Sequence, residues 1–437
     1  MLKRAEIGRR EHLTFKGNLR QTRYGWLRLT PAYSVHQVAE LLGNDGKEAI
    51  VLDPFCGTGT TALVCAERGI ACDTTDINPF LVWLAKAKAG VYKADEVEAF
   101  LGSSPRVVEA IQSNNGRTAW APALHQIEKW WDEQTLTALA RAMAAIKSLE
   151  ETLPPKANDL LRVAFCRTMM DHAHVSFGHQ SMSFKKGKRP EPPPSLFGLE
   201  NHPVAATWER VALVIATAAR SSVHCQPRIL LQDARTLEDS LDADHYTRVV
   251  TSPPYCNRMS YIRELRPYMY WLGFLKSGRE AGELDWRAIG GTWGCATSNV
   301  GKWQPELGSI LPFPGLGDIL RRIAVRSDVL SRYVHKYFRD MARHCKGLLH
   351  CLRPGGTIHY IVGNSKFYDV MLPAQDILAA LFGDAGFADA TARMTRKRTS
   401  KKELFEYVVS ARKPVVVGQP SAAAGIGARR ETPPDRR

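Results

Sequence analysis

The sequence predicts an α/β fold built on a largely parallel sheet, and two observations support this prediction. A strand pattern, a glycine turn, a helix, a second strand and a second helix follow one another within about 45 residues, the alternation typical of a parallel sheet. Strand-like segments return after residue 228, and long helical patterns separate the two parts. We therefore expect one sheet whose strands come from two distant parts of the chain.

The first part of the sheet begins at residues 49–53, an apolar run that ends in an acid and leads into PFCGTGTT. The spacing of TALVCAERG is helical, and Gly69 should close this helix. IACDTTDIN then predicts a second strand that ends in acids. Asn78 is a good N-cap and Pro79 is tolerated at the first helical position, so a second helix should run from here to Gly90.

Composition favours a polyanionic partner. Lys and Arg outnumber Asp and Glu by 59 to 44, which gives a net charge of +15, and neutralising phosphates releases counterions. The nine cysteines form no CxxC pair, which disfavours a cysteine-based zinc site and indicates reduced thiols. No apolar run reaches the roughly 18–20 residues of a membrane span, and the N-terminal residues lack a secretory pattern. We expect a cytoplasmic prokaryotic protein.

The first candidate site is DPFCGTGTT, residues 53–61. Gly57 and Gly59 allow a ligand to approach the backbone, and the following helix offers free N–H groups. No Lys follows the glycines as in a Walker loop, and GxGxxG is absent. Asp76 ends the next strand, where an acid can accept hydrogen bonds from ribose hydroxyls. A tight turn without a ligand, or a solvated acid, is the alternative interpretation.

The second candidate site is the TSPPY segment at the end of a strand. Two prolines stiffen the backbone and remove two N–H donors, so the segment presents carbonyls. The Ser252 oxygen and the Pro253 carbonyl could hold the hydrogens of an aryl amine and orient its nitrogen. Tyr255 offers a face on which an extruded base can stack. A rigid loop with a packed tyrosine is the structural alternative.

With both motifs present, the chain closely resembles the amino-methyltransferases of DNA, in particular the N4-cytosine group with its Ser-Pro-Pro-Tyr motif. The resemblance covers residues 24–92, 228–275 and 326–412. It implies a seven-stranded Rossmann-like methyltransferase sheet. The long helical patterns of residues 95–222 indicate a helical insertion between the second and third strands of that sheet. The resemblance also implies S-adenosylmethionine as methyl donor, double-stranded DNA as substrate, and direct transfer to N4 of cytosine. A restriction–modification or defence setting, with a cognate restriction endonuclease, belongs to the same expectation.

The resemblance also assigns residues. The catalytic loop would be Ser252, Pro253, Pro254 and Tyr255. The donor site would comprise Thr30, Pro31 and Tyr33 from the segment preceding the glycine turn, together with Asp53, Phe55, Gly57, Gly59, Asp76, Asn78 and Asp233. Asp76 would take the ribose and Asp233 would face the adenine amine. No metal is expected.

The predicted organisation has five parts. Residues 1–48 are expected to form an N-terminal segment, residues 49–94 the donor-binding half of the catalytic domain, and residues 95–222 a helical insertion that could recognise the target. Residues 223–417 would form the catalytic half, with a loop-rich insertion at about 276–325, and residues 418–437 a disordered tail.

Two features depart from the family pattern. The donor motif precedes the catalytic motif, whereas many N4-cytosine enzymes have the reverse order, and the 95–222 segment matches no known specificity domain. The alternatives are an adenine-N6 DNA methyltransferase, an RNA base N-methyltransferase such as the guanosine-N2 enzymes of tRNA, and a nucleic-acid-binding subunit without catalysis. The guanosine-N2 enzymes normally carry an N-terminal RNA-binding domain, which is not expected here.

Other features have weaker interpretations. His172, His174 and His179 suggest a metal, but the first two point to different faces of a helix. Cys56 is better explained as a small buried thiol than as a nucleophile. Two basic clusters could be solvated or contact phosphates, namely Lys185, Lys186, Lys188 and Arg189, and Arg393, Arg396, Lys397, Arg398, Lys401 and Lys402. Trp293, Asn299 and Trp303 could contact bases.

Overall fold

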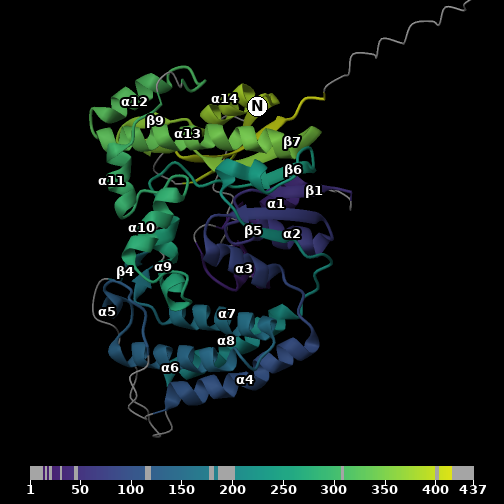
Figure 1. Ribbon diagram of the computed structural model, residues 1–437, viewed down its shortest axis with the longest axis vertical. Coiled ribbons are helices and arrows are strands. Elements are labelled where there is room, and N and C mark those ends of the chain that lie inside the picture. Colours follow the sequence, from purple (N-terminus) through teal and green to yellow (C-terminus); the bar gives the residue numbers. More distant parts are fainter. Residues whose placement is uncertain are drawn as a thin grey trace, which may run out of the picture.

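The computed structural model describes residues 13–14, 17–18, 22–29, 32–43, 48–113, 120–176, 182–185, 202–306, 310–398 and 403–415. Its centre is a seven-stranded sheet (Figure 1). In chain order the strands are β1 (Ile50–Asp53), β2 (Ala71–Asp76), β5 (Arg228–Leu231), β6 (Tyr246–Thr251), β7 (Leu352–Gly363), β10 (Ala388–Lys397) and β11 (Phe405–Arg412). The predicted seven-stranded α/β fold is confirmed.

The spatial order of the strands is β10-β11-β7-β6-β1-β2-β5. Strands β5, β2, β1, β6 and β7 pair in parallel, and β11 lies antiparallel between β7 and β10. Strand order reverses beside β1, because β2 lies on one side of it and β6 on the other. Ligands of open α/β sheets bind at such a reversal, outside the carboxyl ends of the strands.

The helices after the first two strands begin and end as the sequence predicts. Helix α2 (Thr60–Arg68) ends at Gly69, which adopts a left-handed conformation with φ of 68°. Helix α3 (Pro79–Ala89) begins at Asn78, whose side chain accepts a hydrogen bond from the Phe80 N–H. Gly69 thus ends the helix that follows the glycine turn, and Asn78 begins the helix that follows β2.

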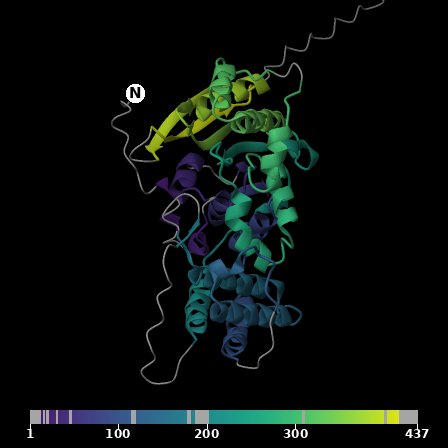
Figure 2. The same cartoon turned by 90° about the vertical axis from the view of Figure 1, so that its left-hand side faces the viewer.

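Between β2 and β5 the chain forms a lobe of helices at one end of the molecule (Figures 1 and 2). Its helices are α4 (Ala94–Gln112), α5 (Ile127–Trp130), α6 (Glu133–Leu149), α7 (Pro155–Asp171) and α8 (Pro203–Ala219). The lobe shares a hydrophobic core with α3 and with α9 (Tyr261–Trp271), in which Phe80, Phe165 and Trp271 are fully buried. It is therefore packed against the sheet domain through helix-to-helix contacts.

Arg23 joins the lobe to the sheet domain. Its guanidinium donates to the carbonyls of Lys88 and Gly90 at the end of α3 and of Ala218, Ala219 and Ser221 at the end of α8. The side chain is 1% exposed. A guanidinium has five N–H donors, so one residue caps the C-termini of two helices.

The stretch predicted to be loop-rich, 276–325, contains three helices. They are α10 (Gly278–Arg287), α11 (Cys295–Lys302) and α12 (Leu316–Ala324). These helices are short, and the connections 288–294 and 303–315 separate them. Two of the glycines in the stretch stand at helix starts. Gly294 and Gly315 are N-caps with positive φ, and Ser277 caps α10 by accepting from the Glu280 N–H.

The rest of the second part is regular. Helices α1 (Val35–Leu42), α13 (Asp328–Cys351) and α14 (Ala374–Ala385) pack around the sheet, and two small hairpins pair β3 (Val175–Ser176) with β4 (Ser183–Phe184) and β8 (Ser365–Phe367) with β9 (Val370–Leu372). Short 3-10 turns span Arg23–Gly25 and Ala234–Asp239. The predicted tail, 418–437, lies outside the described residues. Within the described residues, none of the helices has the length and apolar character needed to cross a membrane.

Candidate active site

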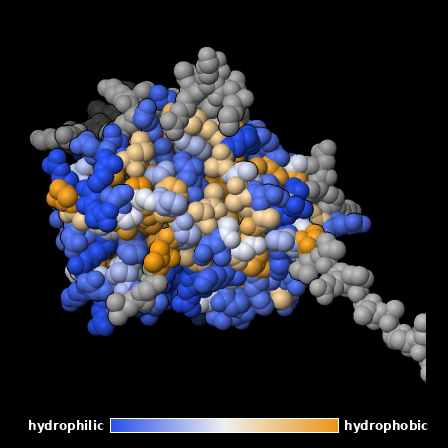
Figure 3. Space-filling view, turned by 90° about the horizontal axis from the view of Figure 1, so that it is seen from above, coloured by the Kyte–Doolittle hydropathy of each residue, from blue (hydrophilic) through white to orange (hydrophobic). Residues whose placement is uncertain are grey.

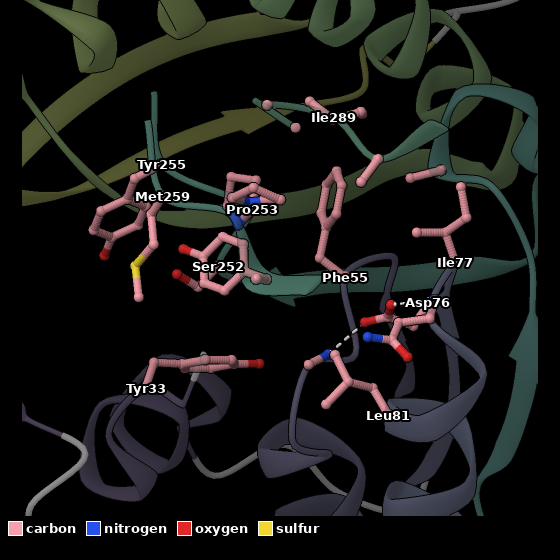
Figure 4. Close-up of a pocket in the computed structure, with 18 of the residues that line it drawn as sticks. Tyr33, Phe55, Asp76, Ile77, Leu81, Ser252, Pro253, Tyr255, Met259 and Ile289 are labelled. Carbon is pink, nitrogen blue, oxygen red and sulfur yellow. Dashed lines mark hydrogen bonds between the residues drawn. The ribbon is translucent and has the colours of Figure 1, made fainter. Parts of the chain in front are cut away.

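A cavity of about 260 Å³ opens at the carboxyl ends of the central strands, and both sequence motifs line it. Phe55 and Gly57 come from the glycine turn after β1, Asp76 ends β2, and Ser252–Tyr255 follow β6. Figure 4 shows Ser252 and Pro253 in the middle, with Tyr255 and Met259 to one side and Phe55, Asp76 and Leu81 to the other. The cavity thus has a glycine-turn end and a tyrosine end, which the SPP backbone separates.

Ten of the fourteen residues expected at the site line this cavity. They are Tyr33, Phe55, Gly57, Asp76, Asn78, Asp233, Ser252, Pro253, Pro254 and Tyr255. Asp53 and Gly59 lie behind the cavity and do not line it, while Thr30 and Pro31 fall outside the described residues. The chemical roles of the ten remain predictions.

Asp53 holds the motifs together from inside the protein. Its carboxylate accepts hydrogen bonds from the Tyr33 hydroxyl at 2.9 Å, the Thr251 hydroxyl at 2.5 Å and the Phe55 N–H at 3.1 Å. Complete burial raises the pKa of this carboxyl. Asp53 therefore links the segment around Tyr33, the glycine turn and the end of β6, and its role in the donor site stays a prediction.

Gly59 packs the glycine turn against α3. It has a φ of 76°, and a Cβ atom here would lie 2.8 Å from the Ala85 Cβ atom. Lys88, also on α3 and 2% exposed, donates its ammonium to the Thr58 carbonyl at 3.1 Å. Burial lowers the pKa of Lys88 to about 8. Gly59 therefore sets the shape of the turn rather than its ligand surface.

Asp76 is held more tightly than the sequence suggested. The sequence argument assigned the capping role to Asn78 and left Asp76 free. In the structure its carboxylate accepts from the Gly57 N–H and the Asn78 N–H, both at 2.9 Å. Burial raises its pKa to about 6, against hydrogen bonds from the backbone N–H groups of Asn78, Gly57 and Ile77. A carboxylate has about four lone-pair directions, so acceptor capacity remains for a ligand in the cavity.

Asp233 forms an ion pair with Arg235. The nitrogen–oxygen distance is 2.6 Å, and the same arginine also reaches Asp340 at 3.4 Å. Burial alone would raise the pKa of Asp233, but the hydrogen bonds from Arg235 outweigh it and lower this pKa. Asp233 still lines the cavity beside Gln232 and Ala234. It is thus an ionised acceptor whose position Arg235 fixes.

The TSPPY loop is anchored at both ends. The Ser252 hydroxyl donates to the Ile361 carbonyl of β7 at 2.9 Å, and the Tyr337 hydroxyl donates to the Pro254 carbonyl at 2.7 Å. The Ser252 proton is therefore committed, and its oxygen lone pairs stay available as acceptors. Tyr337 binds the second of the two proline carbonyls, so Pro253 supplies the other carbonyl of the loop.

The sequence argument missed several lining residues because they are distant in the chain. Met259, Tyr261, Ile289, Gly290, Arg398 and Glu406 also line the cavity. His344 on α13 lies behind them, with its ring edge-on to Phe55 at 4.9 Å. Its Nδ1 atom is 2.6 Å from the Ala234 carbonyl, and burial lowers its pKa to about 4. Only the position of Arg398 and Arg396 in a basic run gave a signal in the sequence.

The weaker sequence features have other surroundings. His172 lies 2.9 Å from the Thr207 hydroxyl, and within the described ranges no group of three or more His, Cys, Asp or Glu could hold a metal. His179 is outside those ranges. Cys56 is fully buried, as the interpretation of a buried thiol expects, and burial raises the pKa of its thiol. Trp293 is 5.7 Å from the Arg266 guanidinium, and Trp303 stacks edge-on against His335.

Of the basic clusters, the second is partly internal. Arg396 pairs with Glu406 at 2.7 Å, with side chains 16% and 6% exposed. The Arg398 guanidinium lies 5.0 Å from the centre of the Tyr255 ring. Neither is a solvated charge, so that alternative is wrong for these two. Lys186, Lys188, Arg189, Lys401 and Lys402 lie outside the described residues.

No protein-family profile matches the sequence. The chain is 22% identical over 415 residues to the Type II methyltransferase M.AvaI of Nostoc sp. strain PCC 7120, across 86% of this chain and 82% of that protein. It is 20% identical to the Type II methyltransferase M.BsoBI of Geobacillus stearothermophilus, across 93% and 87%.

Among solved structures, the rRNA methyltransferase AviRa of Streptomyces viridochromogenes aligns over 87% of this chain and 86% of its own, with a TM-score of 0.27 and 11% identity. With so low a TM-score, this likeness carries no argument about the fold. The two Type II relatives span most of the chain, and the cavity unites the motifs that the resemblance rests on. Along most of its length, the chain is therefore similar to Type II methyltransferases.

Proposed function

We propose that the protein transfers a methyl group from S-adenosylmethionine to N4 of cytosine in a specific DNA sequence. The observation that carries the proposal is the single cavity that joins the glycine-turn end to the tyrosine end across Ser252 and Pro253. A donor and an acceptor bound at the two ends would meet at these residues. Holding two reactants in line supplies much of the catalysis of such a transfer.

The glycine-turn end fits the donor. Asp76 has lone pairs left for ribose hydroxyls, while Phe55, Ile77 and Leu81 offer apolar surface. Asp233, kept ionised by Arg235, can accept from an adenine amine. The bound donor supplies an electrophilic methyl group on a sulfonium centre. The chain's part is to orient this group, because the described residues place carboxylates and apolar side chains around it.

The tyrosine end fits an extruded base. The Ser252 oxygen and the Pro253 carbonyl would each accept one hydrogen of the amine, which holds the nitrogen lone pair toward the methyl group. The Ser252 hydroxyl cannot compete as a donor toward the nitrogen, because its proton goes to the Ile361 carbonyl. A base inside a duplex cannot reach the cavity, so the target base has to be extruded. Tyr255 would then stack on the extruded base. Ser252 is also the residue on which the choice of cytosine depends.

Charge is distributed unevenly along the chain, and this bears on where DNA binds. The 95–222 segment has 14 basic and 14 acidic residues, whereas 251–353 has 16 basic and 8 acidic residues. The end of the molecule that α12, α13 and α14 form is mainly hydrophilic, with small hydrophobic groups between (Figure 3). We propose that phosphates are neutralised mainly by the 251–353 part. Target recognition by the helical lobe would then rest on contacts other than charge.

The test is transfer of a labelled methyl group followed by nucleoside analysis. Whole-genome-amplified DNA is a suitable substrate because it is unmethylated and contains every short sequence. N4-methylcytosine is the expected product, and its absence from treated DNA would remove the proposal. N6-methyladenine would instead assign the adenine reaction, and labelled RNA with unlabelled DNA would assign an RNA enzyme.

One substitution tests the tyrosine end of the cavity while leaving the glycine-turn end unchanged. Tyr255→Ala should lower kcat at least about tenfold, because base–aromatic stacking contributes about 1–3 kcal/mol. Donor affinity, measured by calorimetry, should stay within about twofold of the parent. Tyr368→Ala is the control, since this tyrosine is 52% exposed and does not line the cavity. A Tyr255→Ala enzyme with the parental rate would contradict the stacking role.

We also propose that the methylation serves restriction–modification, because the relatives are named Type II methyltransferases. A cognate restriction endonuclease stays an expectation of the sequence resemblance.

A further inference from the structure

Three charged residues from the last two strands surround the Tyr255 ring. Arg398 lies over one face of the ring, with its guanidinium carbon 5.0 Å from the ring centre. Glu406 accepts a hydrogen bond from the Tyr255 hydroxyl at 3.2 Å. Arg396 holds Glu406 through two hydrogen bonds, of 2.9 and 2.7 Å. The tyrosine is thus fixed at its face and at its hydroxyl by one β-hairpin.

Arg398 is itself held in place by the wall of the sheet. One of its terminal nitrogens donates to the Asn364 carbonyl at 2.9 Å. A Cβ atom on Gly363 would lie 2.3 Å from that nitrogen and 3.0 Å from the Tyr255 ring carbon Cε2. Glycine at 363 therefore makes the room in which the guanidinium and the ring lie together. Both the guanidinium and this ring carbon therefore lie against Gly363, the last residue of β7.

We propose that Arg398 is a positioning residue for the target base. A ring has two faces, and the guanidinium lies over one of them, so a base in the cavity can stack only on the other face. The hydrogen bond to Glu406 prevents the ring from turning away. The base amine is thereby directed to Ser252 and Pro253 and not past them. This inference rests on the proposed function, because it concerns the base half of that same site.

The contact is of the kind that arginine makes well. A planar guanidinium lies flat on an aromatic ring and keeps its edge for hydrogen bonds, whereas a lysine ammonium is a point charge. Arg398 donates to the Asn364 carbonyl while its guanidinium lies over the Tyr255 ring. Replacement by Lys should therefore restore the charge but only part of the orientation.

The experiment compares Arg398→Ala, Arg398→Lys and Arg412→Ala in methyl transfer to whole-genome-amplified DNA from labelled donor. Arg412 is the control, because it lies on β11 of the same hairpin, its side chain is 49% exposed and it does not line the cavity. Arg398→Ala should lower kcat about tenfold with the KM for the donor unchanged, and Arg398→Lys should recover about a third of the parental rate. Arg412→Ala should behave as the parent.

Gly363→Ala provides a second route if Arg398→Ala does not fold. The added methyl group should displace the guanidinium and lower kcat by a similar factor, again with donor affinity unchanged. Parental kcat in Arg398→Ala or in Gly363→Ala would overturn the inference, and so would an equal loss of donor affinity and rate, which indicates general damage. If the parent enzyme itself methylates no DNA, the proposed function fails instead, so the two failures are distinguishable.

Discussion

At the scale of single residues, Asp76 carries a pH dependence that can be measured. Burial raises its pKa to about 6, so the carboxyl is protonated below that pH and ionised above it. A protonated carboxyl has lost an acceptor and carries a hydrogen toward the cavity. Donor affinity should therefore be constant above about pH 7 and fall roughly tenfold per unit below about pH 6. Calorimetry between pH 5 and 8 measures this, and Asp76→Asn should bind weakly at every pH. If the donor affinity of Asp76→Asn falls with decreasing pH as steeply as that of the parent, another group is responsible for the titration.

His344 contributes through the atoms it orients. The Ala234 carbonyl can only accept, so Nδ1 carries the proton and Nε2 accepts from the Tyr360 hydroxyl. His344→Phe would leave two buried polar groups without this partner, each at about 1–3 kcal/mol. We expect a loss of about 2–5 kcal/mol in the free energy of unfolding in urea. His350→Phe, at an exposed position of the same helix, should change little. Equal stability of the two variants would show that the His344 contacts are replaced by water.

Several site residues were predictable because each motif carries its own local signal. The acid at a strand end, the glycines of the turn and the two prolines all act on their immediate backbone, so Asp76, Gly57 and Ser252 could be placed at the cavity in advance. Arg398 and Glu406 could not, because only the pairing of β10 with β11 and β7 brings them beside Tyr255. The hydrogen bonds of Asp53 could not be predicted, for a related reason. Its partners Tyr33 and Thr251 are far apart in the sequence, and burial behind the turn has no sequence signature.

At the scale of elements, the Arg23 contacts predict that replacing this buried residue lowers the free energy of unfolding more than a substitution at a surface residue normally does. Five carbonyls at two helix ends lose their donor if Arg23 is replaced, and water cannot easily reach a residue that is 1% exposed. Arg23→Ala should reduce the free energy of unfolding by about 3 kcal/mol or more. Arg220→Ala, an exposed position at the end of α8, is the control. Urea unfolding followed by circular dichroism measures both, and equal midpoints would refute the joining role of Arg23.

Elements were predicted best where caps and periodicity agree. The bounds of α2, α3 and α13 follow from Gly69, Asn78 and the uninterrupted apolar spacing of 328–351. The short helices of the 276–325 stretch could not be predicted, because a glycine at a helix start and a glycine in a loop look alike in a sequence. Position in space decides between them: Gly315 starts α12, and that helix packs against α13.

At the scale of the whole molecule, the uneven charge predicts which face contacts DNA. Arg322 and Arg326 are exposed at the end of α12, whereas Arg106 and Lys129 are exposed on the helical lobe. Replacing the first pair with Gln should weaken DNA binding at low salt and reduce the slope of log K against log salt by about 1–2. Replacing the second pair should leave both unchanged. Fluorescence anisotropy with labelled duplex DNA at several salt concentrations measures the slopes. Equal slopes for the two double variants would place the phosphate contacts elsewhere.

The continuity of the cavity across Ser252 and Pro253 bears on inhibition. A ligand that fills only the glycine-turn end competes with the donor alone, and one that fills only the tyrosine end competes with the base alone. A single molecule that links an adenosine group to a pyrimidine through a short spacer would occupy both ends at once. Its second half binds at an effective concentration in the millimolar range, so its affinity should exceed that of either half by about 10²–10⁴. The protein would then be best blocked by a bisubstrate compound.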